Sequence, residues 1–282
     1  MPFDSTGKIS FDHIYTAPDP RPYYGTLRRV DYQIPQLAKP YFTKLIEEYQ
    51  AERGNPQPTV LDVGCSYGVN AALLRCETSL DELYAQYTEP GVGDLDREAL
   101  LDRDRRLVRT HSIPDGARFF GLDASGPALA YARSAGFLDN TIRADFEQDD
   151  PDPAQQALLD QVDLVVSTGC VGYVTERTID RIARGSRPWM AHFVLRMFSY
   201  EPVAERLAEL GYETASVDEV FRQRRFASGE EQAHILDALA GAGVDPTGLE
   251  SEGWLYAQLY VSRPVKGAAA GLASALSTVS TE

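Results

Sequence analysis

The sequence predicts an α/β domain built on a doubly wound, mainly parallel β-sheet with helices on both faces. Three observations predict it. Apolar runs rich in β-branched and aromatic residues alternate with helical patterns between residues 59 and 210, which is typical of parallel sheets. The first run passes through a small-residue turn directly into a helix. With 282 residues, 43% of them hydrophobic and 24% charged, the chain has the size and composition of one large folded domain.

The expected elements follow in order along the chain. Residues 1–33 form an arm rich in Tyr and Pro, and residues 36–52 follow the 3/4 spacing of a helix that Gly54-Asn55-Pro56 ends. The strands of the alternating region are expected at 59–63, 119–123, 141–145, 162–167 and 189–198. The helices between and after them are expected at 69–76, 127–135, 154–161, 176–184 and 203–210. Ser125 and Thr175 stand where helix N-caps are needed.

Two regions depart from this alternation. Residues 77–118 are strongly polar and predict two helices, near 80–87 and 94–109. This insertion is expected to be a solvated helical pair, with a substrate cap or a homodimer surface as alternatives. After residue 210 we expect a strand at 221–226, a helix at 230–239 and a last strand at 254–261.

These elements divide the chain into an N-terminal arm and helix (1–56, with a lid as the functional interpretation and an arm packed on the core as the alternative), a main domain (57–264) and a tail (265–282). The tail is rich in Ala, Gly, Ser and Thr, which predicts disorder.

Charge, cysteine content and hydropathy limit the partners. The net charge of −15 repels polyanions at long range, which disfavours a nucleic-acid partner. No apolar run reaches the roughly 18 residues that would span a membrane, and no secretory signal is visible. The three cysteines form no CxxC pair, so we expect neither disulfides nor a metal site, and a cytoplasmic location.

The segment from Asp62 to Gly68 is the first candidate site. Gly64 and Gly68 would let a ligand approach the backbone, because no Cβ intervenes. In a doubly wound sheet this turn lies at the carboxyl ends of the strands, where ligands bind. The dinucleotide pattern GxGxxG is absent, since Ser66 and Val69 stand where it requires glycine, and no GK[ST] follows for a phosphate-binding loop.

Two later aspartates end strands in the same way. Asp123, followed by Ala124, ends the second strand and could accept two hydrogen bonds from a ribose diol. Asp145 ends the third strand, where its carboxylate could meet an adenine amine and Phe146 could supply an apolar wall. The alternatives are a helix cap for Asp123 and an ordinary loop residue for Asp145.

Four segments together resemble the class I S-adenosylmethionine-dependent methyltransferases. VLDVGCSYG is similar to their first motif, with Ser66 in place of the middle glycine, and FFGLDAS to their second-strand acidic motif. IRADFEQ is similar to the adenine-contact motif and DLVVSTGCVGY to the fourth-strand motif. The resemblance covers about residues 57–263. It implies a Rossmann-like sheet of seven strands whose last strand is antiparallel, with the arm, the insertion and residues 221–226 outside the shared pattern.

The resemblance also implies S-adenosyl-L-methionine as the cofactor. Asp62, Gly64, Cys65, Ser66 and Gly68 would shape the methionine pocket. The residues implied for the rest of the cofactor are Asp123 and Ala124 at the ribose, Asp145 and Phe146 at the adenine, and Ser167, Thr168 and Gly169 near the sulfonium.

Methyl transfer from a sulfonium depends mainly on positioning, and a base is needed only where the acceptor must lose a proton. Tyr173 and His192 are the candidate catalytic residues, with a packed aromatic ring and a buried, hydrogen-bonded imidazole as their structural alternatives. Arg196 could hold an acceptor carboxylate or phosphate, with a structural salt bridge as the alternative. The tyrosines of the arm that could contact a partly apolar acceptor are Tyr15, Tyr23 and Tyr24.

The sequence therefore favours a small-molecule methyltransferase, directed to oxygen, with N- or C-methylation open. The fourth strand is not followed by the Asn/Asp-Pro-Pro-Tyr segment of amino-methylating DNA enzymes, and Cys170 lacks the preceding proline of cytosine-C5 enzymes. A protein or peptide methyltransferase is one alternative. A protein that binds S-adenosylmethionine without transferring its methyl is another. A nicotinamide oxidoreductase is a third, disfavoured by the missing GxGxxG and Tyr-x-x-x-Lys patterns.

Overall fold

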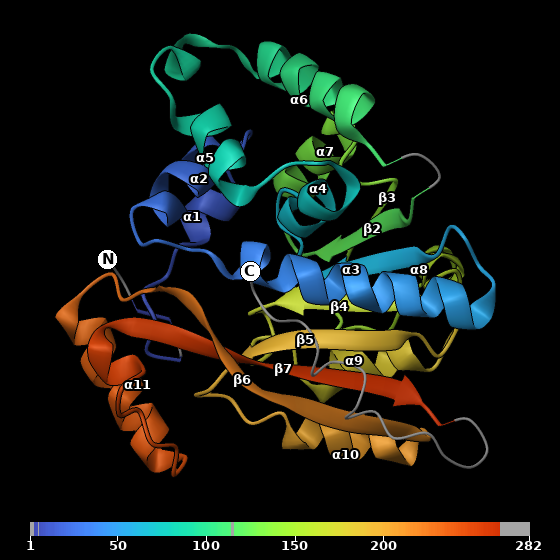
Figure 1. The fold of residues 1–282 in the computed structure, drawn as a ribbon, viewed down its shortest axis with the longest axis vertical. Helices are drawn as coiled ribbons and strands as arrows, with labels where there is room; N and C mark the ends of the chain where they lie inside the picture. Colours follow the sequence, from blue (N-terminus) through green and yellow to red (C-terminus); the bar gives the residue numbers. More distant parts are fainter. Residues whose placement is uncertain (1–2, 5, 114–115, 266–282) are drawn as a thin grey trace.

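A seven-stranded β-sheet forms the centre of the molecule in the computed structural model, which describes residues 3–4, 6–113 and 116–265 (Figure 1). The strand order is β3-β2-β1-β4-β5-β7-β6. The strands are β1 (Thr59–Val63), β2 (Arg118–Asp123), β3 (Asn140–Arg143), β4 (Leu164–Thr168), β5 (Trp189–Leu195), β6 (Tyr212–Arg225) and β7 (Trp254–Pro264). The pairs from β3 to β5 are parallel, and β7 is antiparallel to both of its neighbours. The predicted Rossmann-like fold class is confirmed.

Helices cover both faces of this sheet. One face packs against α3 (Ile34–Arg53), α4 (Val69–Arg75) and α7 (Gly126–Ala135), and Figure 1 shows α3 lying across the strands. The other face packs against α8 (Pro153–Leu159), α9 (Glu176–Ala183) and α10 (Glu201–Glu209). Because side chains alternate along a strand, Val60 of β1 enters the first core while Leu61 and Val63 enter the second.

Local signals fix the helix ends. The Ser125 and Thr175 side chains accept backbone N–H bonds at the starts of α7 and α9, as predicted. Gly54 ends α3 in the left-handed conformation, with φ of 62°. These ends set where the chain leaves each strand and therefore where the loops of the site begin.

The arm and the insertion pack on each other. The arm contains two helices that the sequence pattern did not predict, α1 (Asp12–Tyr15) and α2 (Arg21–Arg28), and the insertion contains α5 (Leu80–Thr88), η1 (Val92–Asp94) and α6 (Arg97–His111). Tyr24 of α2 stacks on Tyr87 of α5, with ring centroids 4.4 Å apart. Figure 1 shows these helices gathered at one end of the molecule, beyond β1 and β2. The insertion is thus a partner of the arm rather than a pair of helices surrounded by solvent.

A strand is confirmed at the position expected for 221–226, but the expected strand is too short. Residues 221–225 end β6, a strand of 14 residues that begins at Tyr212 and pairs with β7 in the sheet. Most residues of β6 are polar, and the strand is partly exposed at the edge of the sheet. Its sequence therefore has no apolar run that would have predicted it. After β6 the chain forms α11 (Gly229–Gly241), η2 (Glu250–Glu252) and β7.

Two observations complete the description. Among the described residues, no helix combines the length and the apolar character needed to cross a membrane. The greater part of the tail predicted to be disordered, residues 266–282, lies outside the described residues.

Candidate functional site

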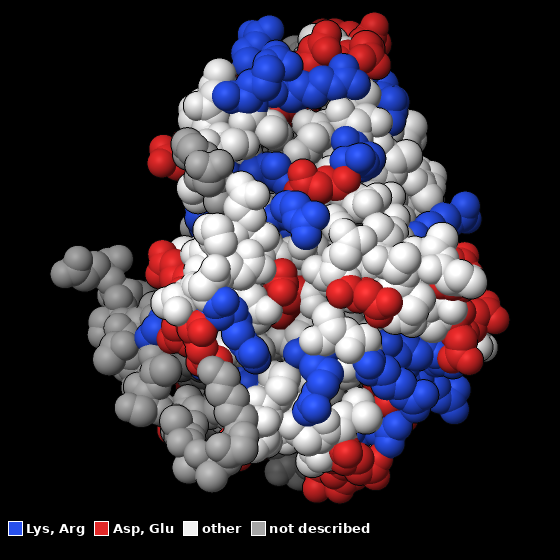
Figure 2. Space-filling view, turned by 90° about the vertical axis from the view of Figure 1, so that its right-hand side faces the viewer, with Lys and Arg blue, Asp and Glu red and all other residues white. Residues whose placement is uncertain are grey.

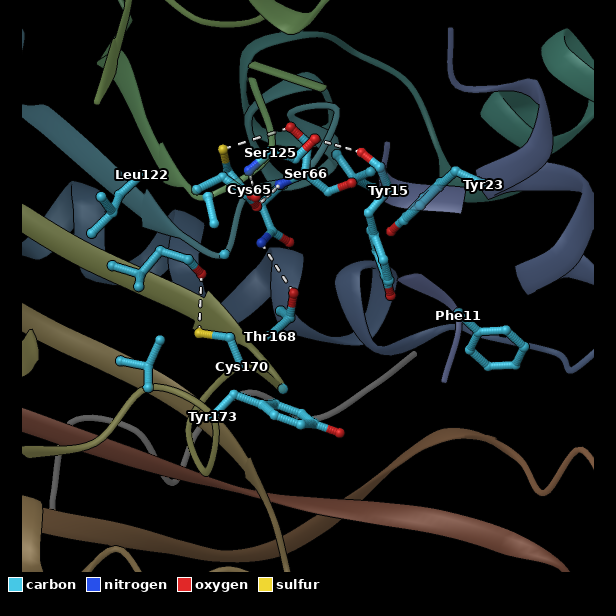
Figure 3. A pocket seen from close by; sticks show the side chains of 18 of the residues that line it. Phe11, Tyr15, Tyr23, Cys65, Ser66, Leu122, Ser125, Thr168, Cys170 and Tyr173 are labelled. Carbon is cyan, nitrogen blue, oxygen red and sulfur yellow. Dashed lines mark hydrogen bonds between the residues drawn. The ribbon is translucent and has the colours of Figure 1, made fainter. Parts of the chain in front are cut away.

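A cavity of about 730 Å³ lies at the carboxyl ends of β1, β2 and β4 (Figure 3). This is the edge of a doubly wound sheet where ligands bind. Its walls come from two sources. One half is made by the loops that follow β1, β2, β3 and β4, and the other by the arm together with Tyr173 and the end of β6. We call these the strand-end half and the arm half.

The turn after β1 has an unusual backbone. Gly64, Ser66 and Gly68 all adopt the left-handed conformation, with φ of 68°, 49° and 77°. A Cβ on Gly64 would lie 2.7 Å from the Cβ of Cys170, so no larger residue fits without a shift. Ser66 takes the left-handed conformation although it has a side chain, which explains how it can replace a glycine of the motif.

Asp123 is fixed at the tip of β2 by two backbone donors. Its Oδ2 accepts from Ser66 N–H at 2.8 Å, and its Oδ1 accepts from Ser125 N–H at 2.8 Å. Each oxygen keeps a lone pair for a further donor. The prediction that Asp123 and Ala124 face the ligand agrees with their place in the cavity wall.

Asn70 joins β1 to β4. Its Nδ2 donates to Asp62 Oδ1 at 3.0 Å and to Thr168 Oγ1 at 3.1 Å, the bond drawn in Figure 3. Asn70 lines the cavity, whereas Asp62 lies behind it. Asp62 Oδ2, Asn70 Oδ1 and Ser66 Oγ are buried without a hydrogen-bond partner in the described part of the chain. Burial, together with the charge of Asp123, raises the pKa of Asp62 to about 7.

The other strand ends complete this half. Asp145 and Phe146 line the cavity after β3, and Asp145 Oδ1 accepts from Glu147 N–H at 3.0 Å. Thr168 and Gly169 line it after β4. Gly169 has φ of 87°, and a Cβ there would lie 2.3 Å from Nε2 of Gln223. The end of β6 therefore meets the end of β4 across the cavity.

Not every predicted cofactor residue faces the cavity. Gly64, Cys65 and Ser66 line it, but Gly68 serves as the N-cap of α4 and does not. Ser167 is fully buried within the sheet, and its hydroxyl shares a 2.8 Å hydrogen bond with Nδ1 of His192.

The structure contradicts a catalytic role for His192. This side chain is fully buried, stands beside Ser167 in the β4–β5 register and does not line the cavity. Burial lowers its pKa to about 4, so the imidazole is neutral at pH 7. The structural alternative, a buried and hydrogen-bonded histidine, is correct because a mid-strand side chain points to the core rather than to the strand end.

Tyr173 lines the cavity, but it is not placed to act as a base. Its hydroxyl donates to Oδ2 of Asp4 in the arm at 2.5 Å. Burial and this hydrogen bond raise the pKa of Tyr173 above its ordinary value, so the phenol keeps its proton. The contact instead joins the loop after β4 to the arm.

The predicted acceptor residues separate into two groups. Tyr15 and Tyr23 line the cavity, and their ring centroids lie 5.8 Å apart. Tyr24 does not line it, because it is 1% exposed and packed against the insertion. Arg196 turns away as well: its guanidinium pairs with Glu250 at 2.5 Å and donates to Asp245 O at 2.9 Å. The predicted contacts of Tyr24 and Arg196 with an acceptor are therefore wrong, and both side chains have structural roles.

Sequence reasoning missed several cavity residues. Those not predicted and now found in the wall include Asp4, Lys8, Phe11, Asn70, Gln223 and Arg224. Asn70 could have been found, since it stands in the first turn of the helix after the glycine turn. The others lie in the arm and in β6, where no motif or periodicity marked them.

Among the described residues, no group of three or more His, Cys, Asp or Glu side chains is placed to hold a metal ion. The site must therefore be understood from its hydrogen-bonding groups and its aromatic walls.

Comparisons with known proteins give structural likenesses only. No family model and no curated protein matches the sequence. One similar structure is magnesium protoporphyrin IX methyltransferase from Synechocystis PCC 6803 with bound SAM, at 10% identity and TM-score 0.39 over 86% of this chain and 79% of that one. The plantazolicin methyltransferase in complex with SAH is similar at 11% identity and TM-score 0.40, over 90% of this chain and 93% of that one.

A third similar structure is geranyl diphosphate C-methyltransferase from Streptomyces coelicolor A3(2), at 9% identity and TM-score 0.40 over 93% of this chain and 88% of that one. With identities and TM-scores this low, we base the functional proposal on this chain's own residues.

Proposed function

We propose that this protein is an S-adenosylmethionine-dependent methyltransferase that acts on a small molecule and transfers the methyl group to oxygen. The observation that carries the proposal is the strand-end half of the cavity. It combines a carboxylate held at the tip of β2 with buried acceptors that lack partners at the tip of β1. A ribose diol and an α-ammonium group are the donors that such a pair of positions suits.

The residues present fit the cofactor at its methionine end. Asn70 Oδ1, in the cavity wall, is a buried acceptor without a partner among the described residues, and Asp62 Oδ2, behind Asn70, is another. A buried polar atom left unpaired costs free energy, so a donor from a ligand would be stabilised there. The Ser66 hydroxyl, also unpaired, could serve the carboxylate of the same amino-acid group.

The fit extends to the other end of the cofactor. The two oxygens of Asp123 are pre-oriented and could accept from both ribose hydroxyls. Asp145 and Phe146 offer an acceptor and an apolar surface to the adenine. Together these groups span the strand-end half, in a cavity whose volume of about 730 Å³ lies within the range of roughly 300–1,000 Å³ usual for small-molecule sites.

The bound cofactor would supply an activated methyl group, whose bond to sulfur breaks as the bond to oxygen forms, leaving a neutral thioether. The protein's part is to position and to exclude water. Thr168 and Gly169 border the junction of the two halves, and the arm covers the acceptor side. We take a carboxylate oxygen as the accepting atom because it needs no base, and because His192 is buried within the sheet and the Tyr173 hydroxyl is bound to Asp4.

The arm wall of the cavity supports a small acceptor over a protein segment. This wall is lined by Ile9, Ser10, Phe11, Tyr15 and Thr16. A basic peptide would instead favour an open acidic groove. The face seen in Figure 2, which is the right-hand side of the view in Figure 1 and not the cavity side, carries acidic and basic side chains interspersed.

The test is calorimetric titration with S-adenosylmethionine, S-adenosylhomocysteine and NAD. We expect both adenosyl ligands to bind and NAD not to bind. Asp123→Ala should weaken S-adenosylhomocysteine binding at least tenfold, or about 1.4 kcal/mol, because two charge-assisted hydrogen bonds are lost. The matched control is Asp237→Ala on α11, an exposed carboxylate without an ion pair among the described residues.

Failure of both adenosyl ligands to bind would overturn the proposal. If both bind, an acceptor screen with labelled methyl separates the remaining alternatives. Methylation of small acids and phenols supports the proposal, methylation of basic peptides alone contradicts its substrate class, and no transfer to any acceptor indicates a protein that only binds the cofactor.

A further inference from the structure

The arm half of the cavity contains a buried lysine without a counter-charge in contact. Lys8 is 9% exposed and lines the cavity. Within the described residues, its Nζ makes no hydrogen bond or ion pair, and it lies 5.1 Å from the centroid of the Tyr173 ring. A buried charge without a partner is costly, so a ligand that supplied one would bind there favourably.

The charged groups around Lys8 are already engaged. Arg224 pairs with Glu231 through bonds of 2.9 and 2.6 Å. The Asp4 carboxylate accepts from the Thr6 hydroxyl and N–H, from the Lys8 backbone N–H and from Tyr173. Lys8 is therefore the cavity-lining cation, in the described part of the chain, whose charge remains free for a ligand.

The protonation state of Lys8 is compatible with this role. Burial and the charge of Arg224 lower its pKa to about 8, while Asp4 and Glu231 act in the opposite direction. The ammonium form still predominates at pH 7. An anion in contact would favour that form further.

A second polar group without a partner lies in the same half. Gln223 is 4% exposed, lines the cavity, and its Oε1 is buried with no hydrogen-bond partner among the described residues. Its amide stands beside Gly169, at the junction with the strand-end half. An acceptor oxygen at this place requires an O–H or N–H donor from the ligand. Figure 3 shows the rings of Phe11, Tyr15 and Tyr173 around one open space, and Lys8 and Gln223 line the same cavity.

We propose that the methyl acceptor is an aromatic carboxylic acid that also carries a hydroxyl or amino group. Its carboxylate pairs with the Lys8 ammonium, its ring lies against Phe11, Tyr15 and Tyr173, and its O–H or N–H donates to Gln223 Oε1. That one of its carboxylate oxygens takes the methyl group, so that the carbon–sulfur bond breaks and an ester forms with no proton to be removed, rests on the proposed function, whereas its binding in the arm half does not.

The test compares 3-hydroxy-2-naphthoate with its uncharged amide, 3-hydroxy-2-naphthamide, by calorimetry with and without S-adenosylhomocysteine. We expect the acid to bind on the order of tenfold to a hundredfold more tightly than the amide, as is typical for a buried charge pair. Lys8→Met, which keeps the length of the side chain without its charge, should remove the preference, and Lys8→Arg should retain part of it. Lys44→Met on α3, outside the cavity, is the matched control and should change nothing.

The outcomes separate this proposal from the proposed function. Equal binding of acid and amide, a preference that survives in Lys8→Met, or no binding of the acid at millimolar concentration would overturn it. So would tighter binding of 2-naphthyl phosphate than of the naphthoate, because the anion would then not be a carboxylate. Unchanged S-adenosylhomocysteine affinity in Lys8→Met shows that the variant is folded. If S-adenosylhomocysteine fails to bind while the wild-type protein prefers the acid, the proposed function fails and the arm-half site stands.

Discussion

The two halves of the cavity are built in opposite ways. In the strand-end half, the polar groups come from the last residues of the strands and from the segments that directly follow them, and Asp123 is held by neighbours after the ends of β1 and β2. In the arm half, Ile9 of the arm donates its N–H to Glu231 of α11, a separation of 222 residues. The first half is thus a property of the sheet, whereas the second is an assembly of distant segments.

This difference indicates where each half can vary. The strand-end half is fixed by backbone conformation, so its ligand is set by the fold. The arm half is fixed by side chains that meet across the cavity mouth, so its ligand can change with a few residues. A comparison of the two halves under mutation should reveal how far they are independent.

The largest effect is expected from Glu231→Gln. Glu231 is fully buried. Its carboxylate accepts two hydrogen bonds from the Arg224 guanidinium and one each from the backbone N–H groups of Ile9 and Ala227. Burial alone would raise the pKa of Glu231, but the hydrogen bonds and charge of Arg224 lower it below its ordinary value. Removing the negative charge leaves Arg224 unpaired, and the free energy of unfolding should fall by about 3–5 kcal/mol in urea titrations.

The control is Glu230→Gln, an exposed neighbour on the same helix, which should leave the unfolding free energy nearly unchanged. S-adenosylhomocysteine affinity should also survive in folded Glu231→Gln. An equal loss of cofactor and acid binding would show that the two halves are not independent.

The next effect is expected from Gly64→Ala in the strand-end half. The new Cβ would need left-handed φ and would meet the Cβ of Cys170 at 2.7 Å. S-adenosylhomocysteine affinity should fall about a hundredfold, equivalent to roughly 2.7 kcal/mol, because the turn must shift.

Gly54→Ala provides the matched comparison. Gly54 has φ of 62° but nothing within 4 Å of the added Cβ. The free energy of unfolding of the Gly54→Ala variant should fall only by the roughly 1–2 kcal/mol that left-handed backbone costs a residue with a Cβ, and its affinity for the cofactor should be unchanged. Equal losses of affinity in the two variants would mean that the contact with Cys170 is not what restricts the turn.

The smallest effect is a pH dependence centred on Asp62. Its pKa in the folded protein, about 7, is raised from the ordinary 3.8 by burial first and by Asp123 second. The folded state therefore binds this proton more tightly than the unfolded state, and the contribution of Asp62 to stability is lost as the pH rises toward 7. Cofactor binding should show the opposite sign, because an α-ammonium group favours the ionised carboxylate.

We expect S-adenosylhomocysteine affinity to rise by up to about tenfold between pH 6 and 8. Calorimetry in buffers of different ionisation enthalpy should detect the proton released. Asp62→Asn should bind with no such dependence. A wild-type profile that is flat over this range would contradict electrostatic coupling between Asp62, behind the cavity wall, and the ammonium group.

The same contrast explains what could be predicted from the sequence. β1, β4 and β5 are buried almost throughout and have mainly apolar sequences, so they and the loops after them were found. Asp123 and Gly64 were found because a strand, a turn and a helix follow one another directly. β6 was mostly missed because an edge strand with one exposed face has no such run.

The errors at the site have a related cause. His192 belongs to a correctly predicted strand, but it pairs in register with Ser167 inside the sheet instead of reaching the strand end. Arg196 lies at the predicted end of its strand, but Glu250, more than fifty residues later in the sequence, binds its guanidinium outside the cavity. Lys8 and Gln223 gave no signal, because only the folded chain brings the arm and β6 together.

The hydrogen bond from Ile9 to Glu231 also has a consequence for synthesis on the ribosome. The arm is translated before α11, and the partner of Ile9 emerges 222 residues later. At about 5–20 residues per second, that delay lasts on the order of tens of seconds. During that interval the N–H of Ile9, a residue that is buried in the finished protein, lacks its native acceptor. The arm therefore completes its native contacts only after α11 has been made, and a chaperone that shields the arm would have this interval in which to act.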